Sequence, residues 1–292
     1  MKMKIKWAVG NARHSLTGAG WLLAVLLPAA GAPAQNLFVG AEGNVYDVGP
    51  GGALTSIAAL NAPVAMTEDS AGNLFVADGD QSIYEITPGG AQSTYASGLA
   101  WTYGLAFNRA GNLLVAGWAT GNIYAIAPGG AQSVFASGAG YPFGLAFDNA
   151  GDLFAADWQG GNIYEFTPGG VRSTFASGLA APVGLAFNPA GNLFVSSQSS
   201  GCIYEFTPGG GQSTFASGLD APAGLVFNSA GDLFEADEYS GNINEFTPDG
   251  GASTVASGFE LPYSVAIAPA PEPPAWGLLA FGLIGLTFLR RR

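Results

Sequence analysis

Histidine, lysine and cysteine are almost missing from this sequence of 292 residues. The only histidine is His14, no lysine follows Lys6, and Cys202 is the single cysteine. Beyond residue 14 there is therefore no imidazole for a general base, for a Ser-His-Asp arrangement or for a His-ligated zinc site. Schiff-base chemistry on lysine is excluded in the same way. One cysteine cannot form an internal disulfide, so the fold must depend on buried apolar surface.

Positive charge is equally scarce in the central part of the chain. Of the 21 acidic residues, all but Glu272 lie between Gln35 and Ala270, where Arg109 and Arg172 are the only cations. A surface this acidic repels phosphate backbones and anionic membranes. Nucleic acid is therefore excluded as a partner of this part of the chain.

The first 34 residues have the pattern of a secretory signal peptide. Lysines and Arg13 make a basic start, Trp21 to Ala30 is a short apolar run, and Ala32-Pro33-Ala34 is a small-residue cleavage site. A membrane anchor is the alternative, but the run is shorter than the roughly 20 residues that span a bilayer. We expect cleavage after Ala34 and export of the rest.

The C-terminus carries a second targeting pattern. A proline-rich linker (269–274) precedes an apolar run from Ala275 to Leu289, and the chain ends with Arg290, Arg291 and Arg292. A helix of fifteen residues is about 22 Å long, against ~30 Å for a hydrocarbon core, so a plain membrane anchor would span only marginally.

The order Pro271-Glu272-Pro273, apolar helix, arginine cluster (271–292) resembles the PEP-CTERM sorting signal of Gram-negative bacteria. The resemblance implies that an exosortase recognises and cuts the tail. It also implies transient anchoring in the inner membrane through the apolar helix, followed by a location at the cell surface or in extracellular polysaccharide.

Between these segments the chain repeats itself every forty residues. GNIYEFTPGG at 161–170 returns as GCIYEFTPGG at 201–210. Within the unit that starts at Gly144, four short runs (GLAF, LFAA, IYEFT and STFAS) are separated by turn residues, which predicts an antiparallel meander of four strands. Helical repeats would need long apolar segments of period 3.6, and none exists here. Inner strands that are apolar on both faces are typical of a β-propeller blade.

The second strand of the repeat unit occurs six times along the chain. The earliest copy, near Asn36, is not preceded by the strand that opens the other units. The missing piece is SVAIA at Ser264–Ala268, which lies in register with the other first strands. The sequence therefore predicts an all-β, six-bladed β-propeller of four-stranded antiparallel blades over residues 35–268, closed by its C-terminal strand. GNLFVAD (72–78) and GDLFAAD (151–157), each followed by an IYE strand, also resemble the NHL-type repeat, which implies the same fold.

The strand order predicts that the loops before first strands and after second strands share one face, here called the upper face. Aromatic and acidic residues gather in the loops of this face. Their rings would stack on a neutral sugar and their carboxylates would accept hydrogen bonds from its hydroxyls, and a cationic ligand would fit as well. Alternatively, the aromatics plug the channel and the aspartates bind turn amides. The turns of the opposite, lower face consist mostly of Gly, Pro, Asn and Ala. The candidate ligand-binding residues are Trp101, Tyr103, Trp118, Tyr141, Phe143, Asp157, Trp158, Asp237, Glu238, Tyr239 and Tyr263.

These observations favour a non-enzymatic binding platform for matrix polysaccharide or a protein partner. Lyases with similar propeller repeats, such as virginiamycin B lyase, rely on histidine, which this part of the chain does not have. Gluconolactonase-like propellers hold Ca²⁺ or Mg²⁺ with carboxylate and Asn ligands at the channel, so a metal-dependent hydrolase is the alternative. No first strand here starts with an acid facing the channel, so we predict no catalytic residue, metal ligand or cofactor. A spacer without a ligand is a third interpretation.

Overall fold

Six four-stranded antiparallel sheets make up the part of the chain that the computed structural model describes, residues 36–79, 81–99 and 101–268. All of these residues belong to the unit Pro33–Arg292. The predicted signal peptide, the proline-rich linker and the sorting signal lie outside the described residues. In the described ranges, no helix is both long enough and apolar enough to cross a membrane.

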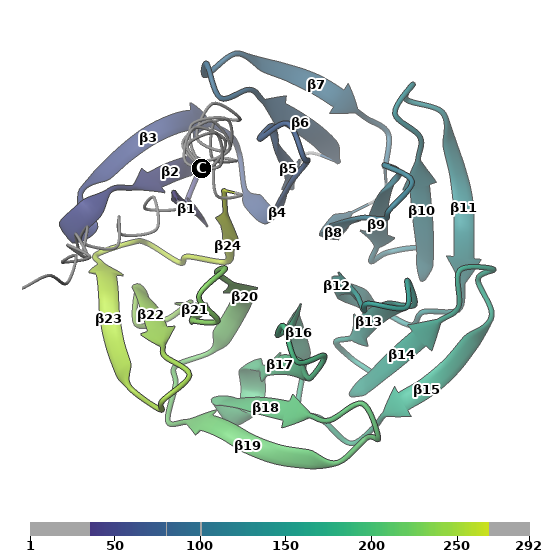
Figure 1. Ribbon diagram of the computed structural model, residues 1–292. Helices are drawn as coiled ribbons and strands as arrows, with labels where there is room; N and C mark the ends of the chain where they lie inside the picture. The colour runs from purple at the N-terminus through teal and green to yellow at the C-terminus, as the bar shows by residue number, and fades with distance from the viewer. Residues whose placement is uncertain (1–35, 80, 100, 269–292) are drawn as a thin grey trace, which may run out of the picture. The chain divides into compact units, whose positions relative to one another are not determined.

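The sheets are the six blades of a propeller, numbered here in chain order, and their strands are given from the inside outwards (Figure 1). Blade 1 holds β24 (Ser264–Ile267), β1 (Leu37–Ala41), β2 (Asn44–Val48) and β3 (Leu54–Ala59). Blade 2 holds β4 (Pro63–Glu68), β5 (Leu74–Asp78), β6 (Ser82–Ile86) and β7 (Gln92–Ala96). Blade 3 holds β8 (Thr102–Phe107), β9 (Leu113–Gly117), β10 (Asn122–Ile126) and β11 (Gln132–Ser137).

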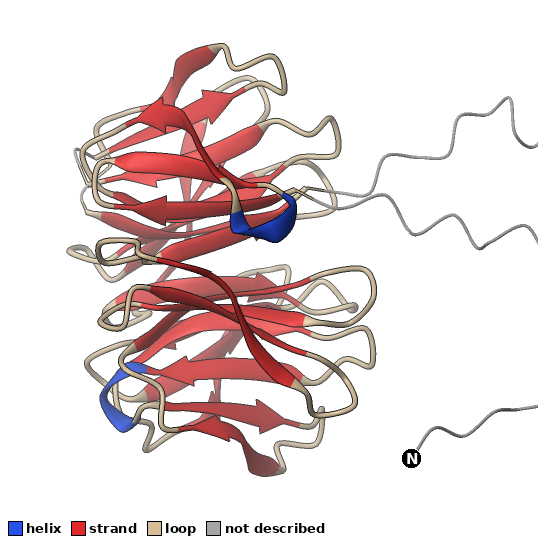
Figure 2. Cartoon of the chain, turned by 90° about the vertical axis from the view of Figure 1, so that its left-hand side faces the viewer, coloured by secondary structure: helices blue, strands red, loops and turns tan. Residues whose placement is uncertain are grey.

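The remaining blades repeat this order. Blade 4 holds β12 (Pro142–Phe147), β13 (Leu153–Asp157), β14 (Asn162–Phe166) and β15 (Arg172–Ala176). Blade 5 holds β16 (Pro182–Phe187), β17 (Leu193–Ser197), β18 (Cys202–Phe206) and β19 (Gln212–Ser217). Blade 6 holds β20 (Pro222–Phe227), β21 (Leu233–Asp237), β22 (Asn242–Phe246) and β23 (Ala252–Ser257). Two 3₁₀ turns, η1 (Pro50–Gly52) and η2 (Gln198–Ser200), are the helical elements among the described residues (Figure 2).

The C-terminal strand closes the ring as the sequence predicts. β24 pairs antiparallel with β1, and Val265 lies opposite Val39. The backbone hydrogen bond from Ala268 N to Asn36 O (2.9 Å) extends the pairing to the last described residue. β24 also contacts the innermost strands of blades 2 and 6. Closure therefore removes the free sheet edge and brings both ends of the described chain to the lower face.

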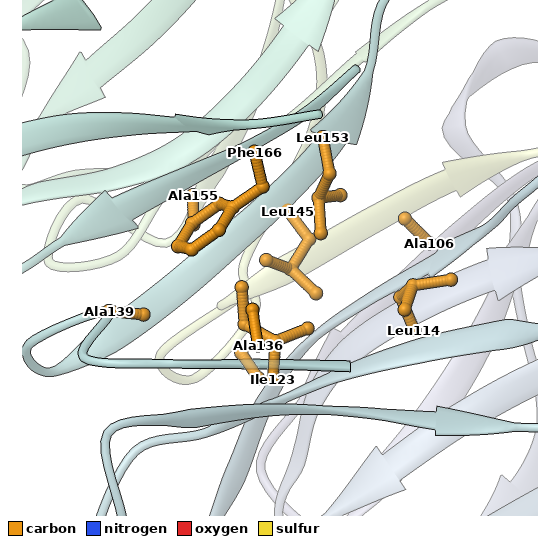
Figure 3. Close-up of a cluster of buried hydrophobic side chains, with 10 residues drawn as sticks. Ala106, Leu114, Ile123, Ala136, Ala139, Leu145, Leu153, Ala155 and Phe166 are labelled. Carbon is orange, nitrogen blue, oxygen red and sulfur yellow. The ribbon is translucent and has the colours of Figure 1, made fainter. Parts of the chain in front are cut away.

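The hydrophobic core is distributed between neighbouring blades. In the cluster drawn in Figure 3, Leu114 and Ile123 of blade 3 pack against Leu145, Leu153 and Phe166 of blade 4. Equivalent clusters fill the other blade interfaces. These positions are the consecutive apolar residues of the repeat, which explains why inner strands need apolar side chains on both faces.

The central channel is lined by aliphatic side chains and glycine. Gly144 of β12 shows why glycine is needed, because an added Cβ would lie 2.1 Å from the carbonyl oxygen of Val183 on the next inner strand. The residue after this position is aliphatic in all six blades and less than a tenth exposed in each. These residues are Met66, Leu105, Leu145, Leu185, Leu225 and Val265.

Candidate functional site

One side chain from each blade closes the upper end of the channel. Tyr103 stacks on Phe143 with ring centroids 4.2 Å apart, and Phe143 contacts Tyr263 at 5.8 Å. The innermost aromatics of the upper face therefore plug the channel, and their outer surfaces form the floor of the face. The six plugging residues are Val64, Tyr103, Phe143, Val183, Ala223 and Tyr263.

A second row of aromatic rings supports this plug from outside. Trp118 is half-buried, and its ring lies 6.1 Å from Tyr103, 5.3 Å from Tyr141 and 6.4 Å from Trp101. Its indole Nε1 is buried and has no hydrogen-bond partner among the described residues. Trp118 therefore acts mainly as packing that positions Trp101 and Tyr103.

Two adjoining hollows lie beside the plug, over blade 2. They share Asn61, Ala62 and Val64. Ala62 and Val64 are the small residues with which blade 2 replaces Trp101 and Tyr103 of blade 3. One hollow, of about 390 Å³, is the aromatic hollow, and the other, of about 490 Å³, is the acidic hollow. Together they are called the upper groove. Each lies within the ~300–1,000 Å³ that is usual for small-molecule sites.

The aromatic hollow is bounded by Trp101, Thr102 and Tyr103 of blade 3. Trp101 is 51% exposed and has a φ of 47°, a left-handed conformation that is unusual for a non-glycine residue. The hydrogen bond from Trp118 N to Trp101 O (2.9 Å) holds this conformation. Thr102 is only 2% exposed, and its Oγ1 has no partner within the described ranges. The hollow thus presents the exposed ring of Trp101, and the Thr102 hydroxyl is buried beneath it.

The acidic hollow is bounded by Glu42, Glu238, Leu261 and Tyr263. Burial raises the pKa of Glu238, while a hydrogen bond from Gln198 lowers it. Burial also raises the pKa of the Tyr263 phenol, and the nearby Glu238 carboxylate raises it further, so the phenol stays protonated. The pKa of Glu42 is also raised, and the largest cause is a hydrogen bond with the Glu260 side chain. The hollow therefore presents both carboxylate acceptors and a hydroxyl donor.

Gln198 connects the two sides of the upper face, and the sequence analysis missed it. Its Oε1 accepts a hydrogen bond from Trp158 Nε1 (3.3 Å), and its Nε2 donates to Glu238 Oε2 (2.5 Å). The Gln198 side chain also forms a hydrogen bond with the Tyr263 side chain. The residue lies in η2, within the serine-rich stretch that follows β17, and no aromatic or charged neighbour in the sequence marks it.

The predicted aspartates hold the loops of the upper face together. Asp157 is buried and accepts hydrogen bonds from Tyr141 N (2.9 Å) and Gly160 N (3.1 Å). Asp237 accepts from Asp220 N at 2.9 and 3.1 Å. Both side chains join the end of a second strand to the loop before the first strand of the same blade. They position the face, and neither lines the upper groove.

Four of the eleven predicted site residues therefore line the upper groove: Trp101, Tyr103, Glu238 and Tyr263. Tyr239 is 65% exposed on the same face but lies outside both hollows. The structure adds groove residues that the sequence did not single out: Ala41, Glu42, Gly43, Asn61, Ala62, Pro63, Val64, Gly79, Thr102 and Leu261.

The channel does not fit the divalent cation of a lactonase. Apart from Ser264 and the rings at its upper end, its lining is apolar side chains and glycine, without the carboxylates that usually bind Ca²⁺ or Mg²⁺. In the part of the chain that the structure describes, no three His, Cys, Asp or Glu side chains are grouped so that they could hold a metal ion.

No protein-family model matches the sequence, and no curated protein matches it significantly. Solved structures, in contrast, do match the fold of this chain. A chain from the crystal structure of a nidogen/laminin complex has a TM-score of 0.73 at 17% identity, covering 81% of this chain and 99% of its own. Virginiamycin B lyase from Staphylococcus aureus has a TM-score of 0.60 at 18% identity, with 76% and 80% covered. A protein of unknown function from Bacteroides caccae has a TM-score of 0.67 at 15% identity, with 80% and 98% covered.

These similarities establish the fold alone. The neighbours come from a nidogen/laminin complex and from a lyase, so the propeller by itself does not distinguish binding from catalysis.

Proposed function

We propose that this chain is an exported, non-enzymatic binding protein whose upper groove takes a neutral polysaccharide of the extracellular matrix. The observation that carries the proposal is the composition of the groove. An exposed ring, Trp101, lies at one end and the carboxylates Glu42 and Glu238 lie at the other. Sugar rings stack on aromatic faces, and their hydroxyls donate to carboxylates.

The Tyr263 phenol supports the same ligand class. It stays protonated and lies beside the carboxylates of the acidic hollow, where its hydroxyl can donate to a sugar oxygen. The position of the chain ends is also consistent with display at a surface. Ala268, the last described residue, lies at the lower face, opposite the upper groove.

The C-terminal tail and the N-terminal segment complete the proposal. A signal peptide over residues 1–34 would direct export from a Gram-negative cell. An exosortase would then process the PEP-CTERM tail and leave the propeller at the cell surface or in the polysaccharide matrix.

Glycan-array binding tests the proposal. The chain, purified in a polyoxyethylene detergent, should bind neutral bacterial glycans, and Trp101→Ala or Glu238→Gln should lower the affinity at least tenfold. Tyr239→Ala is the matched control, because this tyrosine is exposed on the same face but lies outside the groove. Absence of glycan binding by the unmodified chain would favour a spacer or a protein partner. Glycan binding that neither groove substitution alters would show that the binding site lies outside the groove.

A further inference from the structure

The lower end of the channel opens into a cavity of about 660 Å³, on the face opposite the upper groove. Its walls include the residue that ends the conserved GLAF-like run of each blade. Blades 3 to 6 contribute phenylalanine at this position, blade 1 contributes isoleucine, and blade 2 contributes glutamate. These residues are Phe107, Phe147, Phe187, Phe227, Ile267 and Glu68. The sequence analysis missed this cavity because it assigned these rings to strands and considered only the turns of the lower face.

The phenylalanine rings are held in place from behind. Phe107 packs edge-on against Phe75 of the preceding blade, with centroids 4.9 Å apart and an interplanar angle of 79°. Phe187 makes the same contact with Phe154, at 5.1 Å and 74°. Each cavity ring is half-buried, so it is fixed by one neighbour and still borders the cavity. Such walls are preorganised for a ligand.

Glu68 interrupts this apolar ring with a carboxylate. Its Oε2 is buried and has no hydrogen-bond partner among the described residues. Burial raises the pKa of Glu68 to about 7, and the nearby Asp69 raises it as well. Asp69 itself accepts hydrogen bonds from Ala71 N and Asn73 N, both at 2.9 Å. Among the described residues, Glu68 and Asp69 are the ionisable ones that line the cavity.

No described cation neutralises this carboxylate. Arg109 donates to the carbonyl oxygen of Asn149, and Arg172 donates to that of Gly138. Both arginines are thus engaged with the backbone. A carboxylate without a cationic partner, bordering an aromatic cavity, is costly to desolvate unless a positive charge accompanies the apolar group that enters.

We propose that this lower cavity binds a small organic cation with an apolar body, such as an alkylammonium compound, with Glu68 as the counter-charge. The rings of Phe107, Phe147, Phe187 and Phe227 border the cavity, and aromatic rings attract a cation through their quadrupoles and cover its methyl groups. A metal ion fits less well, because Glu68 and Asp69 are two carboxylates only, and no group of three such ligands occurs among the described residues. A neutral apolar ligand leaves Glu68 unpaired, and an anion is repelled. The site is independent of the upper groove.

Calorimetric titration of the full chain with choline chloride tests the proposal, and 3,3-dimethyl-1-butanol serves as the neutral ligand of the same shape. At pH 8 choline should bind with one-to-one stoichiometry and at least tenfold more tightly than the alcohol. Affinity should increase about tenfold from pH 6 to pH 8, because Glu68 must be ionised and its pKa is about 7. Equal affinity for the two ligands would overturn the proposal.

Two substitutions locate the cation. Glu68→Phe installs the residue of blades 3 to 6, so it should fold and should abolish choline binding. Glu68→Gln should weaken binding at least tenfold and remove its pH dependence. Glu85→Gln, in the same blade but outside the cavity, is the matched control and should bind choline normally. Unchanged binding by the folded Glu68→Phe variant, or loss of binding on Glu238→Gln, would contradict the assignment.

Discussion

Glu235 lies directly opposite Asn244 on neighbouring strands of blade 6, and Asn244 Nδ2 donates a hydrogen bond of 2.9 Å to Glu235 Oε2. In every other blade the same two positions hold a small apolar residue and a tyrosine. Those pairs are Val39 with Tyr46, Val76 with Tyr84, Val115 with Tyr124, Ala155 with Tyr164, and Val195 with Tyr204. In blade 6, Glu235 therefore replaces the small apolar residue and Asn244 replaces the tyrosine. The asparagine amide donates a hydrogen bond to the buried carboxylate from the position that a tyrosine occupies in the other blades.

This exchange predicts that stability declines with rising pH. Glu235 is 0% exposed, its Oε1 has no partner within the described residues, and burial raises its pKa to about 8 from 4.5. The folded state therefore binds a proton that the unfolded state has lost between about pH 4.5 and 8. The free energy of unfolding should fall across this window and level off above it. Urea titrations from pH 5 to pH 9 measure this dependence.

Restoring the repeat should remove most of this dependence. The double variant Glu235→Val with Asn244→Tyr should be more stable than the parent at pH 8, and its stability should vary less with pH. Asn244→Tyr alone is the control and should destabilise, because it removes the donor and adds a ring beside the carboxylate. Parallel pH profiles for parent and double variant would show that Glu235 is not responsible. Glu68 makes a smaller contribution of the same sign.

A second prediction concerns the close approach of inner strands around the channel. Gly144→Ala should destabilise the protein by about 1–3 kcal/mol, because its Cβ would lie 2.1 Å from the carbonyl oxygen of Val183 and force the strands apart. Gly129→Ala, in an outer turn, is the matched control, since its Cβ would meet no atom within 4 Å. Urea unfolding compares the two variants. Equal stability for both would mean that the inner strands are not packed this tightly.

The repeat made the fold predictable, because six copies of one unit average out the ambiguity of any single strand. The strand count, the closure by Ser264–Ile267 and the position of the aromatics on the upper face all follow from register alone. The sorting signal and signal peptide stay predictions, since they lie outside the described residues.

The details of the sites could not be predicted in this way, because they arise where one blade departs from the others. The upper groove exists because blade 2 has Ala62 and Val64 where blade 3 has Trp101 and Tyr103. An absent ring is a weak signal in a sequence. Glu68 is a single exception in a ring of apolar residues, and its meaning appears only when six strands are placed side by side.

The upper groove depends on the pairing of Val39 with Val265, because closure of the ring brings Glu42 of blade 1 and Glu238 of blade 6 to the same hollow. Cross-strand neighbours in antiparallel sheets lie about 4.5–5.5 Å apart at Cα, which suits a disulfide. The direct measurement is oxidation of Val39→Cys with Val265→Cys, in a Cys202→Ser background, followed by non-reducing electrophoresis.

The account predicts a nearly complete intramolecular cross-link in the folded protein and a higher midpoint of thermal unfolding. The control pair, Val39→Cys with Val115→Cys, places the second cysteine at the same strand position in blade 3 and should not cross-link. Absence of the Val39–Val265 cross-link, or a yield no greater than that of the control pair, would contradict the closed ring and the upper groove that depends on it.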